Sequence, residues 1–194
     1  GFQDYPEIGM RAEKLAASYP KEAAIRVMTY NLLADTIGFE GSDARSRSEG
    51  VCKIINAISP DAIALQETSR RWYACVINNS RYKLISPLRT GILGTMTALA
   101  YDPLTLSPLI SGDEVFRSGN SSPLRRMVWA VFHHKSNGVT FAVVSTHLSI
   151  TQNERDTVPL MQALELCELA RRLNAAFNCP VILAGDFNAK KSSV

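Results

Sequence analysis

One stretch near the end of the chain constrains the fold more than any other, Val181-Ile182-Leu183-Ala184-Gly185-Asp186-Phe187-Asn188. Its four apolar residues, two of them β-branched, predict a buried strand that breaks at Gly185. An acid and an amide follow at alternate positions, Asp186 and Asn188, and residues two apart in an extended segment share a face. This pair suits a hard cation and a phosphate, although such a stretch is also typical of a turn.

The rest of the chain alternates between strand and helix patterns. Apolar residues with β-propensity predict strands, and apolar residues three and four apart predict helices. The predicted strands are 25–33, 62–65, 82–87, 95–101, 104–110, 125–134 and 139–147, and the predicted helices are 47–58, 72–79 and 158–177. A strand, a helix and a strand in succession favour a crossover unit, a mixed sheet and the α/β class.

The remaining segments are predicted as connections. Residues 1–24 form a peripheral lead-in, while 34–46 and 112–123 are polar or glycine-containing and are predicted as loops. Asn137-Gly138 predicts a hairpin between the two strands that flank it. On the last helix we expect a buried stripe, made of Leu160, Leu164, Cys167, Leu169, Ala170 and Leu173.

Four predicted strands end in polar side chains. They deliver Asn31, Gln66-Glu67, His147 and the Asp186 pair. Strand ends are where α/β folds place their sites, so we expect these groups to lie together. Each has a structural alternative, because Asn31 could cap a loop, Glu67 could pair with an arginine and His147 could be a satisfied core residue. Together they form a coherent set of carboxylates, amides and an imidazole.

These motifs, in this order, resemble those of the endonuclease/exonuclease/phosphatase superfamily, whose members include deoxyribonuclease I and exonuclease III. The resembling segments are Tyr30-Asn31, Gln66-Glu67, Thr146-His147-Leu148 and Gly185-Asp186-Phe187-Asn188. The segment around Arg125, together with Arg155, is similar to a bacterial branch whose substrates are largely unassigned. The resemblance covers residues 25–194, which we expect to form one domain.

The resemblance implies an α/β fold, a two-layer β-sandwich flanked by helices, and a phosphoesterase that uses Mg²⁺ or Mn²⁺. It implies that Glu67 and Asn31 bind the metal and that Asp186 orients or deprotonates the attacking water. It also implies that Asn188 and His147 hold the phosphate, and we expect Arg125 and Arg155 to contact it too. The chemistry is reasonable, because attack on a phosphoester requires neutralisation of developing charge.

The chain departs from the family pattern at its end. The family adds a late Asp-His pair, whereas the three histidines here, His133, His134 and His147, all precede Asp186. We therefore expect a truncated member, incomplete at the C-terminus, with an open sheet edge and little or no activity. The alternative function is a non-catalytic binding module that keeps the fold.

Composition leaves the substrate open. The net charge of +3 does not predict a broad nucleic-acid surface, and no exposed apolar loop that would suit a phospholipid head group stands out. A nucleic acid, a phospholipid head group and a small phosphoester therefore all remain as partners. The oligomeric state is not predicted.

Location and redox state are predicted only in outline. No apolar run reaches the length of about 18 residues that spans a bilayer, so we expect a soluble protein. The chain begins with Gly1 instead of Met, which suggests a processed start and leaves a secreted or periplasmic location open. The four cysteines, Cys52, Cys75, Cys167 and Cys179, are expected to be small buried hydrophobes without a required disulfide, with a Cys167–Cys179 link as the alternative.

Overall fold

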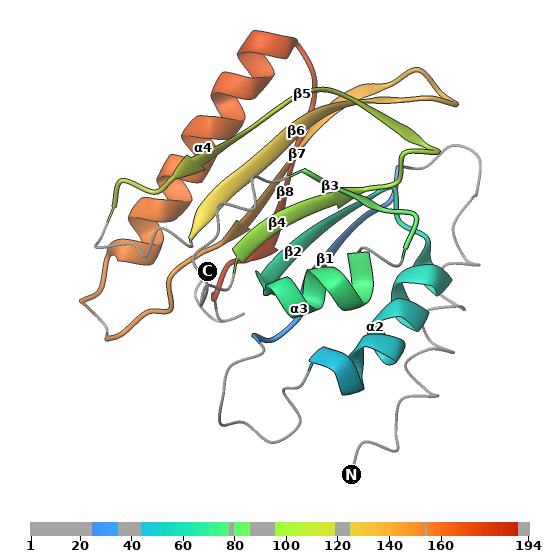
Figure 1. Cartoon of the computed structure of the whole chain (residues 1–194). Helices are drawn as coiled ribbons and strands as arrows, with labels where there is room; N and C mark the ends of the chain where they lie inside the picture. The colour runs from blue at the N-terminus through green and yellow to red at the C-terminus, as the bar shows by residue number, and fades with distance from the viewer. Residues whose placement is uncertain are drawn as a thin grey trace.

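Two sheets pack face to face at the centre of the molecule (Figure 1). The computed structural model describes residues 25–34, 44–77, 80–85, 96–118, 125–153 and 155–189. In the described chain the first sheet has the order β1 (Val27–Asn31), β2 (Ala62–Thr68), β4 (Met96–Tyr101) and β3 (Lys83–Ile85). The second has the order β5 (Leu106–Val115), β6 (Arg126–His134), β7 (Thr140–His147) and β8 (Val181–Asp186).

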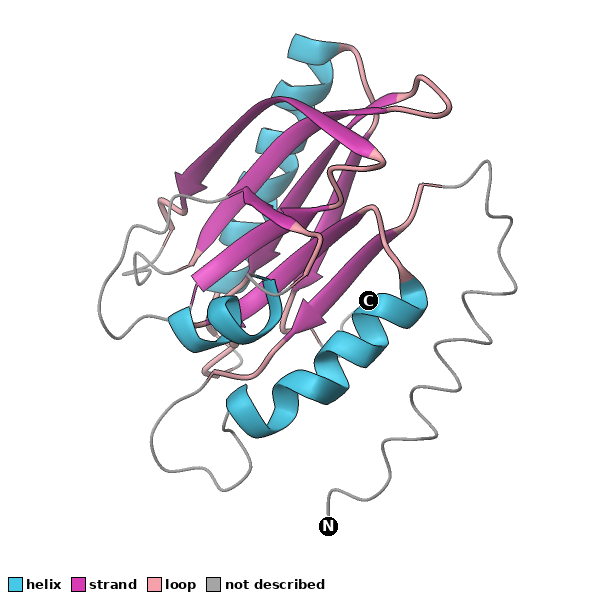
Figure 2. Ribbon diagram, turned by 45° about the vertical axis from the view of Figure 1, so that its right-hand side comes forward, coloured by secondary structure: helices cyan, strands magenta, loops and turns pink. Residues whose placement is uncertain are grey.

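Helices cover the outer face of each sheet (Figure 2). The first sheet is covered by α2 (Ala44–Ile58), by the single turn α3 (Arg70–Trp72) and by the π-helical turn η1 (Tyr73–Ile77) that continues it. The second sheet is covered by α4 (Val158–Phe177). The layers therefore run helix, sheet, sheet, helix, which confirms the predicted two-layer sandwich flanked by helices.

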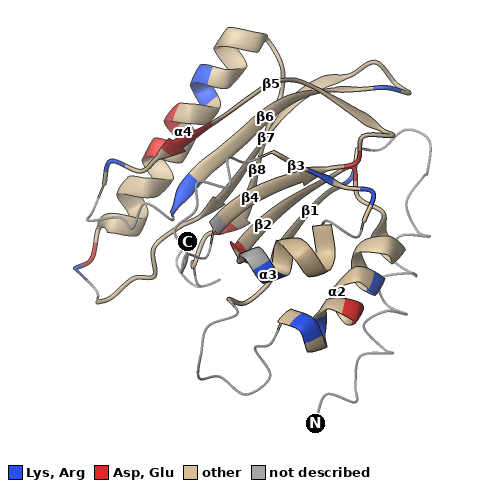
Figure 3. Ribbon diagram, viewed as in Figure 1, with Lys and Arg blue, Asp and Glu red and all other residues tan. Residues whose placement is uncertain are grey.

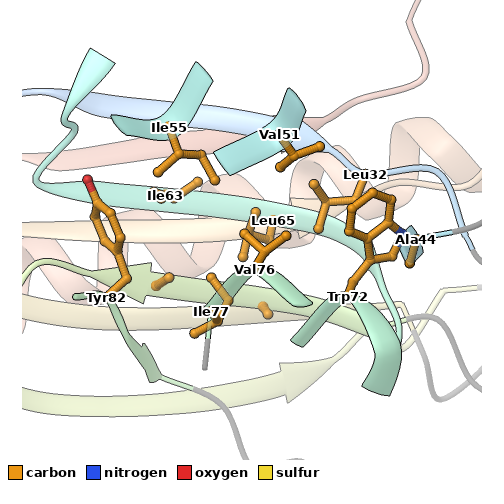
Figure 4. Packing of buried hydrophobic residues seen from close by; sticks show 12 residues of the cluster. Leu32, Ala44, Val51, Ile55, Ile63, Leu65, Trp72, Val76, Ile77 and Tyr82 are labelled. Carbon is orange, nitrogen blue, oxygen red and sulfur yellow. The ribbon is translucent and has the colours of Figure 1, made fainter. Parts of the chain in front are cut away.

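Alternation along the strands divides the core into layers. On β2, Ile63 and Leu65 face the helices, where they pack with Val51 and Ile55 of α2 and with Trp72 (Figure 4). The alternate residues face the other sheet, because successive side chains of a strand point to opposite faces. The same strand thus supplies two separate cores.

The layer between the sheets combines small and large side chains. Ala62 of β2 lies in the same cluster as Phe132 of β6 and Phe141 of β7, whose ring centroids are 6.0 Å apart. Small residues on one sheet leave room for aromatic rings from the other, so the two inner faces interdigitate. This packing fixes the distance between the sheets and so between the strand ends.

Two parallel strand pairs bring the polar strand ends together. β1 pairs with β2, and β7 pairs with β8, each in parallel. Across the sandwich β1 packs on β8 and β2 packs on β7. The carboxyl ends of all four strands therefore meet at one end of the sandwich.

Two predicted boundaries are wrong. The loop predicted over 112–123 begins too early, because β5 continues to Val115, where Gly112 packs against the Trp129 indole and Asp113 pairs with Arg126. The loop predicted over 34–46 also overlaps a helix, since α2 begins at Ala44, which is fully buried. In both cases tertiary packing overrides a polar or glycine-containing local sequence.

The predicted buried stripe on α4 is confirmed at Leu169 and Leu173 but is wrong in its first half. Leu160 and Leu164 are 61% and 55% exposed, and Cys167 is exposed as well. The buried residues of α4 are Gln162, Leu166, Leu169 and Leu173. Both sets follow helical spacing, so the pattern alone does not choose between them. Polar contacts favour the observed face, because Gln162 Oε1 accepts from Ser149 N at 2.7 Å.

Several predictions fall outside the described residues. The lead-in over 1–24, the central part of the first loop and the ends of two predicted elements at 78–79 and 86–87 belong to this group. Within the described chain no helix combines the length and the apolar character that membrane crossing requires. All four cysteines are free thiols, and exposed Cys167 does not fit the expectation that each is buried.

Gly185 is expected to be essential for the end of β8. It has φ of 156°, and a Cβ there would collide with the backbone oxygen of Thr146 on β7. Gly185→Ala should therefore lower the free energy of unfolding by about 2 kcal/mol or more, measured by urea denaturation.

Gly138→Ala is the matched control. Gly138 has φ of 75°, but a Cβ there would meet open space. Its cost should be limited to the left-handed conformation, about 1 kcal/mol. Equal losses of unfolding free energy in the two variants would show that the collision with Thr146 adds nothing to the cost of Gly185→Ala.

Candidate active site

All predicted site residues except Arg155 lie at or next to the shared end of the four strands. Asn31 ends β1, Glu67 lies near the end of β2, His147 ends β7 and Asp186 ends β8. Arg125 directly precedes β6, the strand that pairs with β7. Residues from both sheets therefore contribute to one cluster.

The side chain of Asn31 joins the two sheets. Its Nδ2 donates to Glu67 Oε1 at 3.0 Å and to Asp186 Oδ2 at 2.9 Å. Its Oδ1 accepts from the Leu33 amide at 2.9 Å. An amide nitrogen has two hydrogens, so it can serve both carboxylates at once. These contacts also assign the nitrogen and oxygen of the Asn31 side chain. The two carboxylates need a donor, which is Nδ2, and the backbone N–H of Leu33 needs an acceptor, which is Oδ1.

A bulge aims Glu67 at the cluster. The register between β2 and β4 shifts between Leu65 and Thr68, and Glu67 has φ of 55°. Strict alternation would place Glu67 on the helix-facing side with Leu65. The bulge redirects the side chain, as bulges beside active sites commonly do. Glu67 Oε2 then accepts from the Ala34 amide at 2.7 Å, which leaves the carboxylate fixed at both oxygens.

Asp186 is held as a carboxylate. Burial by itself raises its pKa, but hydrogen bonds from Asn31 Nδ2 and from the Asn188 amide, with the charges of His147 and Arg125, lower the pKa below its ordinary value. The Asn188 amide donates to Oδ1 at 2.9 Å. Asp186 is therefore ionised at neutral pH and is a hydrogen-bond acceptor.

His147 lies beside this carboxylate but is not closely bonded to it. The distance from His147 Nε2 to Asp186 Oδ2 is 3.8 Å, which is too long for a hydrogen bond. Burial lowers the pKa of His147, the charge of Arg125 lowers it further, and the charges of Asp186 and Glu67 oppose both. The imidazole is therefore neutral at pH 7 and can donate from one ring nitrogen.

Arg125 and Asn188 hold the end of β7 from either side. Arg125 Nη1 donates to the carbonyl oxygens of His147 and Leu148. Asn188 Nδ2 donates to the same Leu148 oxygen at 2.7 Å. Burial lowers the pKa of Arg125, and the charges of Glu67 and Asp186 oppose this, which places the guanidinium near both carboxylates. One amide hydrogen of Asn188 remains for another acceptor.

Sequence reasoning named Gln66 at a polar strand end but assigned no role to the residues that support the cluster. Gln66 is 1% exposed and its Oε1 accepts from Thr29 Oγ1 at 3.3 Å. Thr29 lies two residues before Asn31 and Gln66 lies one before Glu67, so both belong to the layer beneath the site. Trp72 is fully buried, and its Nε1 donates to Leu33 O at 2.9 Å. The polar side chains of Thr29 and Gln66 in otherwise apolar strands could have indicated this supporting role.

Arg155 is not connected to the cluster by the contacts of the described residues. It is exposed in the loop before α4, where its amide donates to Asn153 Oδ1 at 3.0 Å. Its contact with phosphate stays a prediction. The other predicted site residues, Asn31, Glu67, Arg125, His147, Asp186 and Asn188, are brought together.

The donor set limits which cation the cluster could hold. The Lys, Arg, Asp and Glu residues of β2, β6 and β8 are Glu67, Arg126 and Asp186, and each lies at or near the end of its strand (Figure 3). In the described part of the chain no three His, Cys, Asp or Glu residues form a metal cluster. Two carboxylates, Glu67 and Asp186, share the Asn31 amide. This set fits Mg²⁺, which keeps several waters and needs only one or two carboxylates.

Several solved structures share this fold. The human nocturnin catalytic domain has a TM-score of 0.71 and 20% identity, with 87% of this chain and 65% of that chain covered. TDP2 from C. elegans has a TM-score of 0.71 and 21% identity, with 100% and 56% covered. A mannosyl-6-phosphatase from Bacteroides thetaiotaomicron has a TM-score of 0.71 and 19% identity, with 87% and 67% covered.

At these identities the likeness shows the fold alone, and the chain spans less than two thirds of nocturnin's catalytic domain and of the worm TDP2. A search of curated proteins gave no match. The sequence model of the Endonuclease/Exonuclease/phosphatase family matches residues 28–194, a range that includes every residue of the cluster. The chain therefore belongs to the endonuclease/exonuclease/phosphatase family.

Proposed function

We propose that this chain carries the metal- and phosphate-binding centre of a divalent-metal-dependent phosphoesterase. The observation that carries the proposal is the bridge from Asn31 Nδ2 to both Glu67 and Asp186. It holds two carboxylates from different sheets beside a cationic guanidinium and a neutral imidazole. Phosphoester hydrolysis needs both kinds of group, one for a cation and one for phosphate oxygens.

Each residue has a role that follows from its contacts. Glu67 and Asp186, with Asn31, would hold Mg²⁺ or Mn²⁺, which supplies neutralisation of phosphate charge and acidifies a bound water. Asp186, ionised and fixed at both oxygens, accepts a hydrogen bond from the attacking water and orients its lone pair toward phosphorus. His147 and the free amide hydrogen of Asn188 donate to phosphate oxygens, and Arg125 adds positive charge.

Asn31 takes a modified role in this proposal. The family resemblance implied that Asn31 is a metal ligand, yet its Oδ1 already accepts from the Leu33 amide. A carbonyl oxygen has two lone pairs, so Oδ1 keeps one for a cation. We assign Asn31 mainly to positioning the two carboxylates, with Glu67 as the principal ligand.

Metal binding tests the assignment directly. Calorimetric titration of Mn²⁺ and Mg²⁺ into Glu67→Gln should show affinity about tenfold or more below that of the wild type, because a neutral amide replaces a charged ligand. Glu168→Gln makes the same charge change on an exposed α4 residue and should bind normally. Equal affinity in wild type and Glu67→Gln would remove Glu67 from the metal site.

Turnover separates the enzyme from the non-catalytic alternative. The chain should hydrolyse bis(p-nitrophenyl) phosphate in a Mg²⁺-dependent manner, because the cation neutralises charge that develops on the phosphate oxygens. Asp186→Asn should abolish this hydrolysis, whereas Glu168→Gln should retain it. Metal and phosphate binding with no turnover at all would support the binding module instead.

The protonation of His147 gives a prediction about pH in the metal-free protein. Its pKa lies below the ordinary value of about 6.5, so the unfolded chain binds the proton more tightly than the folded chain. The stability contributed by neutral His147 is thus complete above pH of about 6.5 and is lost as pH falls through the lower folded pKa. An NMR titration of the imidazole signals should give a His147 pKa below the ordinary value.

Substitutions of charged residues near His147 test the electrostatic cause of its lowered pKa. Asp186→Asn removes a charge that raises the His147 pKa, so the pKa should fall further. Arg125→Met removes a charge that lowers it, so the pKa should rise. A His147→Gln variant assigns the signal among the three histidines. Shifts in the opposite directions would contradict the proposed arrangement of charges.

A further inference from the structure

Leu33 is the least expected residue at the edge of the site. It lies two residues after Asn31 and has φ of 58°, a left-handed conformation that large apolar side chains rarely adopt. Its side chain is 51% exposed, whereas the neighbouring Leu32 and Ala34 are buried. Single exposed leucines are common, but a leucine that is both exposed and in a strained conformation needs a reason.

The surrounding hydrogen bonds enforce this conformation. Leu32 N donates to Gln66 O at 3.0 Å, Leu33 N to Asn31 Oδ1 at 2.9 Å and Ala34 N to Glu67 Oε2 at 2.7 Å. On the other side Trp72 Nε1 donates to Leu33 O. Figure 4 shows Leu32 and Trp72 close together in the core beneath this turn. The backbone of the turn is thus fixed by the same groups that build the site.

Two further exposed apolar side chains follow the other strands of the site. Phe187, between Asp186 and Asn188, is 39% exposed, and Ile150, three residues after His147, is 56% exposed. With Leu33 they form what we term the apolar rim. Its members follow β1, β7 and β8, the strands that deliver Asn31, His147 and Asp186 to the cluster.

We propose that Leu33 is a specificity-determining residue that contacts the organic group of the substrate. The inference rests on the proposed function, because the phosphate at the cluster sets where that organic group lies. The substrate is then a phosphoester whose organic group is apolar or aromatic next to the phosphate. A strongly hydrated group such as a sugar would lose water against Leu33 without a polar partner. In this proposal the strained turn presents the Leu33 side chain to that organic group.

Two phosphate monoesters test the proposal, phenyl phosphate and methyl phosphate, in calorimetric titrations of the full chain with saturating Mg²⁺. Wild type should bind phenyl phosphate about fivefold or more tightly than methyl phosphate, because the ring buries apolar area against Leu33. Leu33→Asn should reduce this ratio to about one, with methyl phosphate affinity unchanged. Asparagine adopts the left-handed conformation readily, so the turn is preserved.

A remote variant and a stability measurement separate specificity from structure. Leu109→Asn changes a leucine on β5 that is 60% exposed, and it should keep the wild-type ratio. Leu33→Asn should have an unchanged or higher midpoint of urea unfolding, since the strain is relieved. A lowered midpoint with the ratio intact would show that Leu33 is structural and would overturn the proposal.

The outcomes also distinguish this inference from the proposed function. Equal binding of the two esters by wild type would overturn the role of Leu33 and leave the phosphate site standing. A failure of wild type to bind either ester or inorganic phosphate in the presence of Mg²⁺ would overturn both proposals.

Discussion

The amide of Asn31 is the interaction on which the site depends. Glu67 and Asp186 come from different sheets and carry the same charge, so they would repel one another if nothing lay between them. One nitrogen donates to both, and the guanidinium of Arg125 adds a compensating charge. The bridge connects the relative position of the two sheets with the geometry of the carboxylates. A small change in the packing of the two sheets would therefore change the distance between the two carboxylates.

Backbone strain accompanies this arrangement. Leu33, Glu67 and Asn188 all have positive φ, and each lies at the carboxyl end of a strand that contributes to the site. Such conformations persist only where neighbouring groups enforce them, and here they turn side chains toward the cluster or outward from it. The buried Gln66, which accepts from the exposed Thr29, and the buried indole of Trp72 support these turns. The strained residues thus lie next to the candidate site.

The fold is shared with nocturnin, TDP2 and a mannosyl-6-phosphatase, each at about one fifth sequence identity. A sandwich of this kind depends on which residues are apolar and where they alternate, so many sequences satisfy it. Substrate choice depends instead on side chains around the strand ends. In this chain three exposed apolar residues, Leu33, Ile150 and Phe187, follow strand ends of the site.

The sequence by itself determined the strands, most helices, the α/β class and the set of groups that meet at the strand ends, because hydrophobic periodicity and local polar motifs are carried by consecutive residues. Only the tertiary structure decided which face of α4 is buried, since Leu160 and Leu166 belong to stripes with the same helical spacing. It also decided that Glu67 turns at a bulge toward Asp186, which lies 119 residues later and which strict alternation would not have placed beside it. The physical reason is that these choices depend on contacts between distant segments, whose geometry a local pattern does not contain.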